Sequence, residues 1–442
     1  MLQLALNFVT SLGGIVLIPI VIIILGLIVQ LRPTKAILAG LTVGIGMIGT
    51  NAIISILSTA LEPAVQAMVS NFGLSLSILD VGNGIGGPLA FSTTLGIIII
   101  PIAIFINLVL IFTGLTKTLN VDIWNLWQSA FVGIMTWGVT GDYLLAILVM
   151  VPFFLIELIL ADAFQPKVSE FFNLPGISIT HVMALSGLVL ATPINWLFDH
   201  IPFFKRTEID PETIQKKFGF FGNPIIIGFI IGIVMGVLAG FEFGHICQLG
   251  METAAVLALL PKMIAMFMEG LTPIAGATQE FTSKHLHGKT LNIGMDAALT
   301  VGNPAVLAVS LLMIPVTLLL AVILPGNKVL PLGDLPMLVY ALCLTVAAYR
   351  GDIIRSVLGS AVYVVTMLYL STWIAPAFTS AYQIAGYDAG GSIVSFVTAG
   401  LWPNVITLGS AQFFGYAGVG ILTVILLGIL FYMNRIKKWN QA

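Results

Sequence analysis

Runs of about 20 apolar residues recur along the chain and constrain its fold more than any other feature. A helix needs roughly 20 mostly apolar residues to cross the hydrocarbon core of a bilayer. About ten segments qualify, at 15–31, 36–60, 95–113, 143–161, 224–241, 246–268, 305–324, 337–349, 356–375 and 417–433. The 442 residues are 58% apolar and only 8% charged, against roughly 25% charged in a soluble domain. The sequence therefore predicts an all-α polytopic membrane protein.

Other segments are too short, too polar or too rich in glycine to be plain spans: 64–94, 129–141, 176–198, 269–303 and 386–412. We interpret them as interfacial amphipathic helices or re-entrant hairpins. The chain also holds 45 glycines and 21 prolines. Transporters use both residues to interrupt membrane helices beside a substrate site.

The same composition excludes several function classes. A net charge of -2 without a basic run argues against nucleic-acid binding. The two cysteines indicate neither a disulfide framework nor a metal cluster, and no two of the five histidines have HxxxH spacing. No phosphate-binding loop or dinucleotide fingerprint is present. We therefore expect no cofactor, no metal and no catalytic residue on this chain.

One long hydrophilic stretch, 199–222, carries four basic residues, and Arg435, Lys437 and Lys438 follow the last apolar span. Basic residues next to membrane spans favour the cytoplasmic side. We therefore expect both the stretch and the C-terminus to lie in the cytoplasm.

An internal repeat relates the two halves of the chain. Offsets between 210 and 216 residues align the same order of features in each half. The aligned pairs are Gly26 with Gly236, Gly40 with Gly250, Pro63 with Pro273, Asp80 with Asp296, Pro88 with Pro304, Pro101 with Pro315 and Asp122 with Asp334. Coincidence in a glycine-rich apolar chain is the alternative, but the preserved order argues against it.

The repeat predicts four parts. They are a first transmembrane repeat at 1–200, a cytoplasmic connecting loop at 201–222, a second repeat at 223–412, and a C-terminal helix with a basic tail at 413–442. An odd number of crossings in each repeat would invert the second copy relative to the first, as in many transporters.

Interrupted segments at corresponding places in inverted repeats indicate the substrate site. Here they are 80–88 and 296–304, which pair Asp80 and Asn83 with Asp296 and Asn303. A carboxylate and an amide facing a cavity suit a neutral polyhydroxylated solute. The alternative is that both aspartates only cap helices.

Two further residues are candidates for substrate contact. His181 opens a segment of intermediate hydropathy, where an imidazole could bind a hydroxyl or accept a proton. Glu269 stands where an apolar span meets the break at Pro273. Each could equally be a satisfied polar residue with no ligand.

Several long phrases resemble the galactitol-type enzyme IIC, the membrane permease subunit of the phosphoenolpyruvate-dependent sugar phosphotransferase system. They are Asn120–Trp127, Gln215–Pro224, Gly270–Ile274, Gly294–Leu299 and Pro325–Leu335. The resemblance runs from the first span to about residue 360, and the phrases occur in the family's order.

The resemblance implies a permease of the bacterial inner membrane that works with separate IIA and IIB subunits. A IIB phosphocysteine would phosphorylate the substrate held by this subunit, so the phosphoryl donor would not lie on this chain. The related ascorbate-type enzyme IIC implies a homodimer of inverted repeats that works by an elevator mechanism.

One phrase departs from the family. The family reads Asp-Val-Gly-Trp-Pro where this chain has Asp80-Val81-Gly82-Asn83-Gly84. The change removes an aromatic surface and adds an amide. The resemblance therefore leaves galactitol, another hexitol and a pentitol open as substrates.

Two other functions remain open. An ion-coupled secondary transporter would use Asp80 or Asp296 as a proton or sodium site. A membrane scaffold without transport has no need of paired broken helices. Neighbouring genes for IIA-like and IIB-like proteins would favour the phosphotransferase permease.

Overall fold

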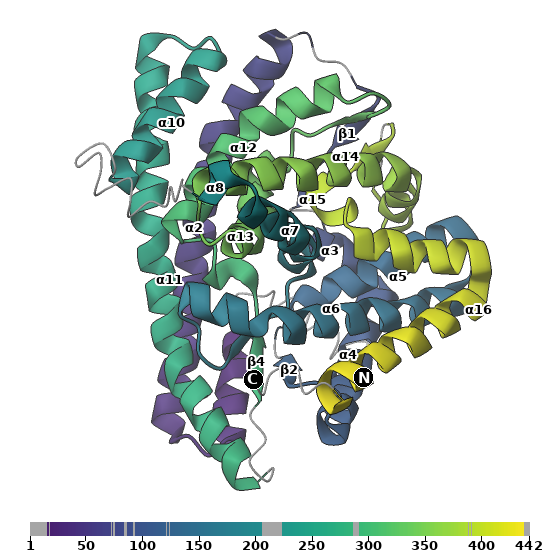
Figure 1. Cartoon of the computed structure of the whole chain (residues 1–442). Coiled ribbons are helices and arrows are strands. Elements are labelled where there is room, and N and C mark those ends of the chain that lie inside the picture. Colours follow the sequence, from purple (N-terminus) through teal and green to yellow (C-terminus); the bar gives the residue numbers. More distant parts are fainter. Residues whose placement is uncertain are drawn as a thin grey trace.

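The computed structural model describes residues 16, 18–71, 73, 76–83, 86–91, 93–120, 122, 124–205, 223–285, 291–387, 389 and 391–436. Most of the predicted loop at 201–222 and the basic pair Lys437 and Lys438 lie outside these residues. Helices dominate the described part (Figure 1). The prediction of a mostly helical polytopic membrane protein is therefore confirmed.

The predicted spans coincide with helices. The first contains the apolar helix Ile18–Ile28. The others fall in α2 (Pro33–Asn71), α4 (Thr94–Thr113), α6 (Tyr143–Phe172), α10 (Pro224–Leu238), α11 (Phe243–His285), α12 (Pro304–Ile323), α13 (Leu338–Ala348), α14 (Ile353–Ile384) and α16 (Trp402–Phe431). Among the described residues, six helices are long and apolar enough to cross a membrane.

The segments between the spans form short helices and also short strands, and the all-α prediction did not include the strands. The strands are β1 (Ile78–Asp80), β2 (Thr118–Asn120), β3 (Ile177–Ile179), β4 (Asn292–Met295), β5 (Val329–Leu330) and β6 (Ile393–Val394). The helical elements are α3 (Gly86–Phe91), η2 (Trp124–Leu126), α5 (Trp127–Thr140), α7 (Val182–His200), α8 (Pro202–Lys205), η4 (Ala297–Leu299), η5 (Leu335–Met337), α15 (Phe396–Ala399) and η6 (Tyr432–Ile436).

Two of these helices lie in segments that we interpret from the sequence as interfacial helices or re-entrant hairpins, and neither is an interfacial helix. Every residue of α5 from Trp127 to Thr136 is buried, so this helix lies in the core rather than on a membrane surface. Helix α7 has 19 residues and is apolar enough to span. Hydropathy alone does not distinguish these cases, because protein packing rather than lipid covers the polar side chains of both helices.

Polar side chains start several of the long helices. Asn303 caps α12, Asn223 caps α10, Asp142 caps α6 and Asp352 caps α14, each by accepting a hydrogen bond from a backbone N–H of the first turn. The first N–H groups of a helix have no partner within the helix, so these oxygens satisfy donors that lipid could not.

The six strands form two small parallel sheets, and each sheet mixes strands from both halves of the chain. One has the order β5-β1-β6, and the other has the order β2-β4-β3. In Figure 1, β1 lies toward the top of the view and β2 and β4 toward the bottom. The two sheets therefore occupy different ends of the molecule.

The two sheets share one hydrogen-bond pattern. In each, the first two residues of the central strand donate to the residues that precede the two outer strands: Ile78 to Lys328, Leu79 to Ser392, Asn292 to Lys117 and Ile293 to Gly176. This register places Asp80 level with Gly294. The sequence alignment instead pairs Asp80 with Asp296, two positions further on, so it stays a prediction.

Helices α2, α10 and α11 pack together on one side of the molecule (Figure 1). With 39 and 43 residues, α2 and α11 would extend about 58 and 65 Å. Gly270 of α11 lies against the backbone of Ala39 and Val43 in α2. Small residues let helix backbones approach this closely in a bilayer.

The last long helix, α16, is broken near the predicted start of the C-terminal part. Gly415 has φ 56° and ψ -142°, which no helical residue adopts. Beyond it the helix packs along α6, and Asn434 donates to the carbonyl of Leu115 at 2.8 Å. The predicted final span at 417–433 is therefore a helix, joined to 402–414 by a kink.

Candidate functional site

His181 and Asp296 meet where two parallel strands end. Strands β3 and β4 are paired, and the Thr180 N–H donates to the carbonyl of Met295 at 3.0 Å. The residues that follow the two strands therefore emerge side by side. His181 Nδ1 lies 2.9 Å from Asp296 Oδ1, and His181 is only 5% exposed. Two predicted site residues from opposite halves of the chain thus lie in direct contact.

The third strand of this sheet contributes Asp122 and Asn125. Strand β2 ends at Asn120, and the chain turns into η2 two residues after Asp122. Asn125 Nδ2 donates to Asp122 Oδ2 at 2.6 Å and lies 3.3 Å from His181 Nδ1. We call Asp122, Asn125, His181 and Asp296 the histidine cluster. All four come from segments outside the helices of spanning length.

The carboxyl groups of the histidine cluster have opposite pKa shifts. Burial, together with repulsion by Asp296, raises the pKa of Asp122 to about 7. Burial alone would raise the pKa of Asp296 as well, but its interactions with His181 and the hydrogen bond from the Ala298 N–H lower it below its usual value. Asp296 is therefore the ionised partner of the imidazole.

One side of the imidazole has no protein partner. Because Nδ1 faces a carboxylate, it carries the hydrogen and donates it to Asp296. Nε2 is buried and has no hydrogen-bond partner among the described residues. Tyr340 of α13 stacks on the ring, with centroids 5.8 Å apart and planes 26° apart. The imidazole is held in one orientation with a free acceptor nitrogen.

A further set of polar bonds supports the cluster from α6. Asn120 Nδ2 donates to Glu157 Oε1 at 2.6 Å, and the Thr180 hydroxyl donates to Asn120 Oδ1 at 3.3 Å. Asp162, one helical turn further on, accepts hydrogen bonds from the hydroxyls of Thr116 and Thr118. These carboxyls anchor β2 to α6, and the Thr180 hydroxyl joins the end of β3 to Asn120 of β2.

The other sheet carries a second carboxyl pair, Asp80 and Asp334, which we call the aspartate pair. Asp80 Oδ2 accepts the backbone N–H of Asp334 at 2.8 Å. Asp334 Oδ2 accepts the Ser395 hydroxyl at 2.7 Å and the Val397 N–H at 3.2 Å. Burial and repulsion by Asp334 raise the pKa of Asp80 well above its usual value. A proton held by the pair relieves this repulsion.

Asp80 is surrounded by backbone donors. Its Oδ1 accepts the N–H groups of Gly82 at 3.2 Å and Phe396 at 3.3 Å. Gly82 has φ 83° and lies against Gly333, where a Cβ atom would stand 2.4 Å from the Gly82 nitrogen. Only glycine fits such a crossing of two chains. The aspartate pair therefore ties together two closely packed backbone segments.

The structure separates the remaining predicted site residues. Asn83 accepts the Thr398 hydroxyl at 2.8 Å, beside the aspartate pair. Asn303 is the N-cap of α12 and accepts the N–H of Ala305 at 2.9 Å. Glu269 is exposed on α11. The structure brings His181 together with Asp296 and Asp80 close to Asn83, and it does not join Glu269 or Asn303 to either cluster.

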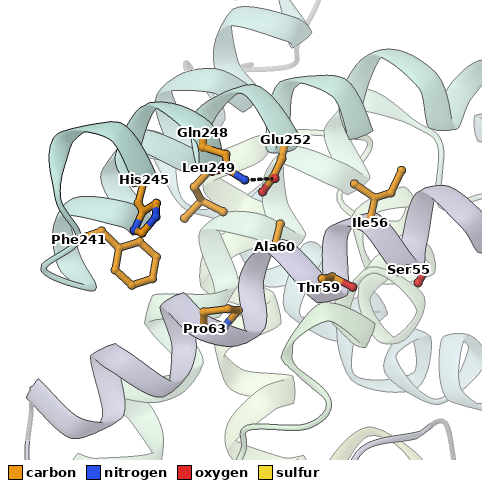
Figure 2. Close-up of a pocket in the computed structure, with 10 residues that line it drawn as sticks. All are labelled: Ser55, Ile56, Thr59, Ala60, Pro63, Phe241, His245, Gln248, Leu249 and Glu252. Carbon is orange, nitrogen blue, oxygen red and sulfur yellow. Dashed lines mark hydrogen bonds between the residues drawn. The ribbon is translucent and has the colours of Figure 1, made fainter.

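A pocket of about 640 Å³ lies elsewhere, between α2 and the start of α11 (Figure 2). Its polar side chains include His245, Gln248 and Glu252, and Gln248 donates to Glu252 at 2.9 Å. Figure 2 shows Pro63 and Thr59 of α2 facing these residues. The pocket contains none of the predicted site residues.

A family model described as the sugar-specific permease component of the PTS system matches residues 7–391. The chain belongs to this family. The predicted resemblance to the phosphotransferase permeases is therefore confirmed. The match ends just before β6, so it includes both halves of the chain and every strand except β6.

Named relatives agree with the family. The permease component is 35% identical over 424 residues to a protein of Escherichia coli (strain K12) named "Putative permease IIC component", covering 96% of this chain and 95% of the relative. It is 33% identical over 438 residues to the PTS system galactitol-specific EIIC component of the same organism, covering 99% and 96%. The galactitol-specific component of Escherichia coli O157:H7 matches to the same extent.

The candidate site residues predicted from the sequence do not include Asp122, Asn125 and Asp334 of the two clusters, nor Tyr340, which stacks on His181. Asp122 and Asp334 had been aligned only as repeat markers, and Asn125 and Tyr340 had not been singled out. The signal was present for three of them, since Asp122 and Asn125 lie in one family phrase and Asp334 in another. Among the described residues, no group of three or more His, Cys, Asp or Glu side chains could hold a metal ion.

Proposed function

We propose that this permease component binds a polyol at the histidine cluster and carries it across the bacterial inner membrane. It then presents the polyol for phosphorylation by the phosphocysteine of a separate IIB subunit, which a IIA subunit recharges. The observation that carries the proposal is the buried, unpartnered Nε2 of His181 beside an ionised Asp296, in a chain of this family.

The chemistry of the cluster suits a neutral polyhydroxylated ligand. Carboxylate oxygens of Asp296 and Asp122 accept hydrogen bonds from hydroxyls, as does the free imidazole nitrogen. The amide of Asn125 adds a donor and an acceptor. A charged ligand would need a countercharge, and no lysine or arginine contacts these four residues in the described part of the chain.

The substrate class follows from the relatives and from one departure. Two relatives are named as galactitol-specific, so galactitol and related hexitols or pentitols are the proposed substrates. Asn83 stands where the family has an aromatic residue, and its oxygen is engaged by Thr398. Asp80, Asn83, Glu269 and Asn303 stay predictions as ligands, and the contacts around Asp80 favour a structural role.

Uptake into membrane vesicles tests the proposal. Radiolabelled galactitol, other hexitols and pentitols are supplied with and without the phosphorylated IIB partner, and the accumulated product is identified. We expect a phosphate ester that forms only with the partner. Free solute that accumulates without the partner and leaves on addition of a protonophore contradicts the proposal and favours an ion-coupled secondary transporter.

We also infer that the two halves are inverted repeats. The shared hydrogen-bond pattern of the two sheets supports this, because each sheet pairs a central strand of one half with two outer strands of the other. The layer of α2, α10 and α11 would then be the fixed scaffold of a homodimeric elevator, and the remainder would move against it. The C-terminus would lie in the cytoplasm.

Cysteine labelling from either side of the membrane tests the inverted repeat. The turns at 31–36 and 241–246 connect equivalent helix pairs, so they should label from opposite faces. A cysteine in the loop at 201–222 should label from the cytoplasm. Labelling of both turns from the same face contradicts inversion.

A further inference from the structure

The residues around His181 fix its imidazole ring in a way that suits a chemical role as well as a binding role. Its ring is fixed on three sides, by Asp296 at Nδ1, by the stacked Tyr340, and by the strand ends that set its backbone. It precedes α7 as the N-cap residue, yet its side chain makes no capping bond. The imidazole is therefore free for chemistry at its one unpartnered atom, Nε2.

We propose that His181 Nε2 is the base that takes the proton from the substrate hydroxyl while that hydroxyl is phosphorylated. This inference rests on the proposed function. It adds a reaction step at the same site: the sequence left open whether His181 binds a hydroxyl or accepts a proton, and the inference assigns the proton transfer to Nε2.

The arrangement is that of a general base held by a carboxylate. A base must present an unprotonated atom to the proton it abstracts, and its orientation must be fixed by a third group. Asp296 accepts the hydrogen bond from Nδ1–H, so the neutral imidazole presents Nε2 as its unprotonated acceptor nitrogen. Asp296 itself is held by the Ala298 N–H at 3.0 Å. The carboxylate also stabilises the imidazolium that forms after the transfer.

The step balances. The substrate oxygen forms a bond to phosphorus as the sulfur–phosphorus bond of the partner's phosphocysteine breaks, and the thiolate leaves on the partner. The hydroxyl proton moves to His181 Nε2. After the phosphorylated polyol departs, this proton passes to water, and the imidazole returns to its starting form.

Other titratable groups surround the imidazole and must be separated from it in any pH experiment. Asp296 and Asp122 flank it, Tyr340 and Cys343 face it or Asp296 from α13, and Glu157 of α6 lies next to Asp122. An acid limb in the rate could come from Asp122 as well as from His181, so both need a variant.

The experiment measures polyol-phosphate formation at saturating polyol with the phosphorylated IIB partner, between pH 5 and pH 9. Polyol binding is measured separately on the purified permease without the partner. We compare the wild type with His181→Gln, which can accept a hydrogen bond near the Nε2 position but cannot take a proton. His200→Gln makes the same change at the far end of α7 and is the matched control.

We expect His181→Gln to bind polyol within about tenfold of the wild type and to lower the transfer rate about 100- to 10,000-fold, the usual contribution of a general base. The acid limb of the rate profile should disappear in this variant and remain in Asp122→Asn. His200→Gln should keep both the rate and the profile. A His181→Gln rate within fivefold of wild type, with the acid limb intact, overturns the inference.

A second variant keeps the test decisive if His181→Gln does not bind. Asp296→Asn would donate its amide hydrogen to Nδ1 and place the ring hydrogen on Nε2, which removes the acceptor. The transfer rate at saturating polyol should then fall at least 100-fold although the histidine remains. A rate within fivefold of wild type contradicts the base. If the wild type itself binds no polyol and forms no ester, the proposed function fails instead.

Discussion

The two carboxyl clusters sit at the ends of two sheets with the same strand pairing, yet they are built from different donors. The backbone N–H groups of Gly82, Asp334 and Phe396 donate hydrogen bonds to the carboxyl oxygens of Asp80. In the histidine cluster, side chains supply most of the contacts, and Nε2 of His181 stays unpartnered among the described residues. The first cluster ties two backbone segments together, although Asp334 Oδ1 also has no partner among the described residues. The second cluster keeps its free acceptor on an imidazole, which can take up a proton.

A single position just after the outer strands accounts for much of this difference. Val397 lies as far beyond the start of β6 as His181 lies beyond the start of β3. Val397 can offer Asp334 only its backbone N–H, whereas His181 offers Asp296 a ring nitrogen and keeps a second one free. The same pattern of strand pairing can therefore hold two backbone segments together in one sheet and support a ligand site in the other.

The largest effect is expected for Asp80→Ala in the aspartate pair, where the change should lower the stability of the fold. Removing this carboxylate leaves three buried N–H groups without an acceptor, each at a cost of about 1–3 kcal/mol. We expect little folded, monodisperse protein and a clearly lower midpoint of thermal unfolding. Asp80→Asn, which keeps one acceptor oxygen, should lose less. A stable Asp80→Ala protein that no longer binds polyol would instead place Asp80 in the substrate site.

A change in the histidine cluster should lower the affinity for polyol. Asp296→Asn keeps the size of the side chain but removes a charge-assisted hydrogen bond, worth about 1.5–3 kcal/mol. We expect the dissociation constant for polyol to rise about 10- to 150-fold in folded protein. The matched change Asp80→Asn should alter it less than threefold. Equal losses in both variants would return the two aspartates to one shared role.

The pH dependence of stability should also report on the histidine cluster. The pKa of Asp122 rises from its model-peptide range to about 7 on folding, so the folded state binds the proton more tightly. Stability from this group is full below about pH 4, falls as the pH rises toward 7, and is lost above that value.

Thermal unfolding midpoints between pH 4.5 and pH 8.5 check this. The wild type should lose stability with rising pH, and Asp122→Asn should lose less because it cannot titrate. Parallel curves for the two proteins would mean that Asp122 is ionised in the folded state throughout this range.

The smallest expected effect belongs to Thr398→Val. The change removes the hydroxyl that donates to Asn83 at 2.8 Å while keeping the shape, which should cost about 0.5–1.5 kcal/mol in stability. Polyol affinity should stay within twofold if Asn83 serves the aspartate pair. A change of more than threefold in the dissociation constant would show that the Asn83 amide contacts the substrate.

Much of the chain could be predicted from the order of its residues. Apolar length located the spans, because lipid demands some 20 apolar residues wherever a helix crosses. The interrupted segments at 80–88 and 296–304 identified places where helices stop, and the family phrases identified the phosphotransferase permeases. His181 could be nominated as a candidate because an ionisable side chain within membrane segments faces a partner or a cavity, but the sequence left a satisfied polar residue equally open.

The partners of those residues could not be predicted. Nothing in the sequence says that β3 and β4 pair across a separation of more than a hundred residues, or that their register sets His181 against Asp296. The strands are two to four residues long, too short for an alternating pattern to be visible. The alignment of the two halves pairs Asp80 with Asp296, yet the two aspartates have different neighbours in the structure.

The sequence by itself determined that this is a membrane protein, where its long helices lie and to which family it belongs. The lengths of apolar runs and the local family phrases are both properties of residues that are neighbours in the chain. Only the tertiary structure decided which carboxyl groups are filled by backbone donors and which are left facing a free imidazole nitrogen. Hydrogen bonding depends on distances of about 3 Å between atoms from different strands. Those distances are set by strand register across the two halves, which no single stretch of the chain encodes.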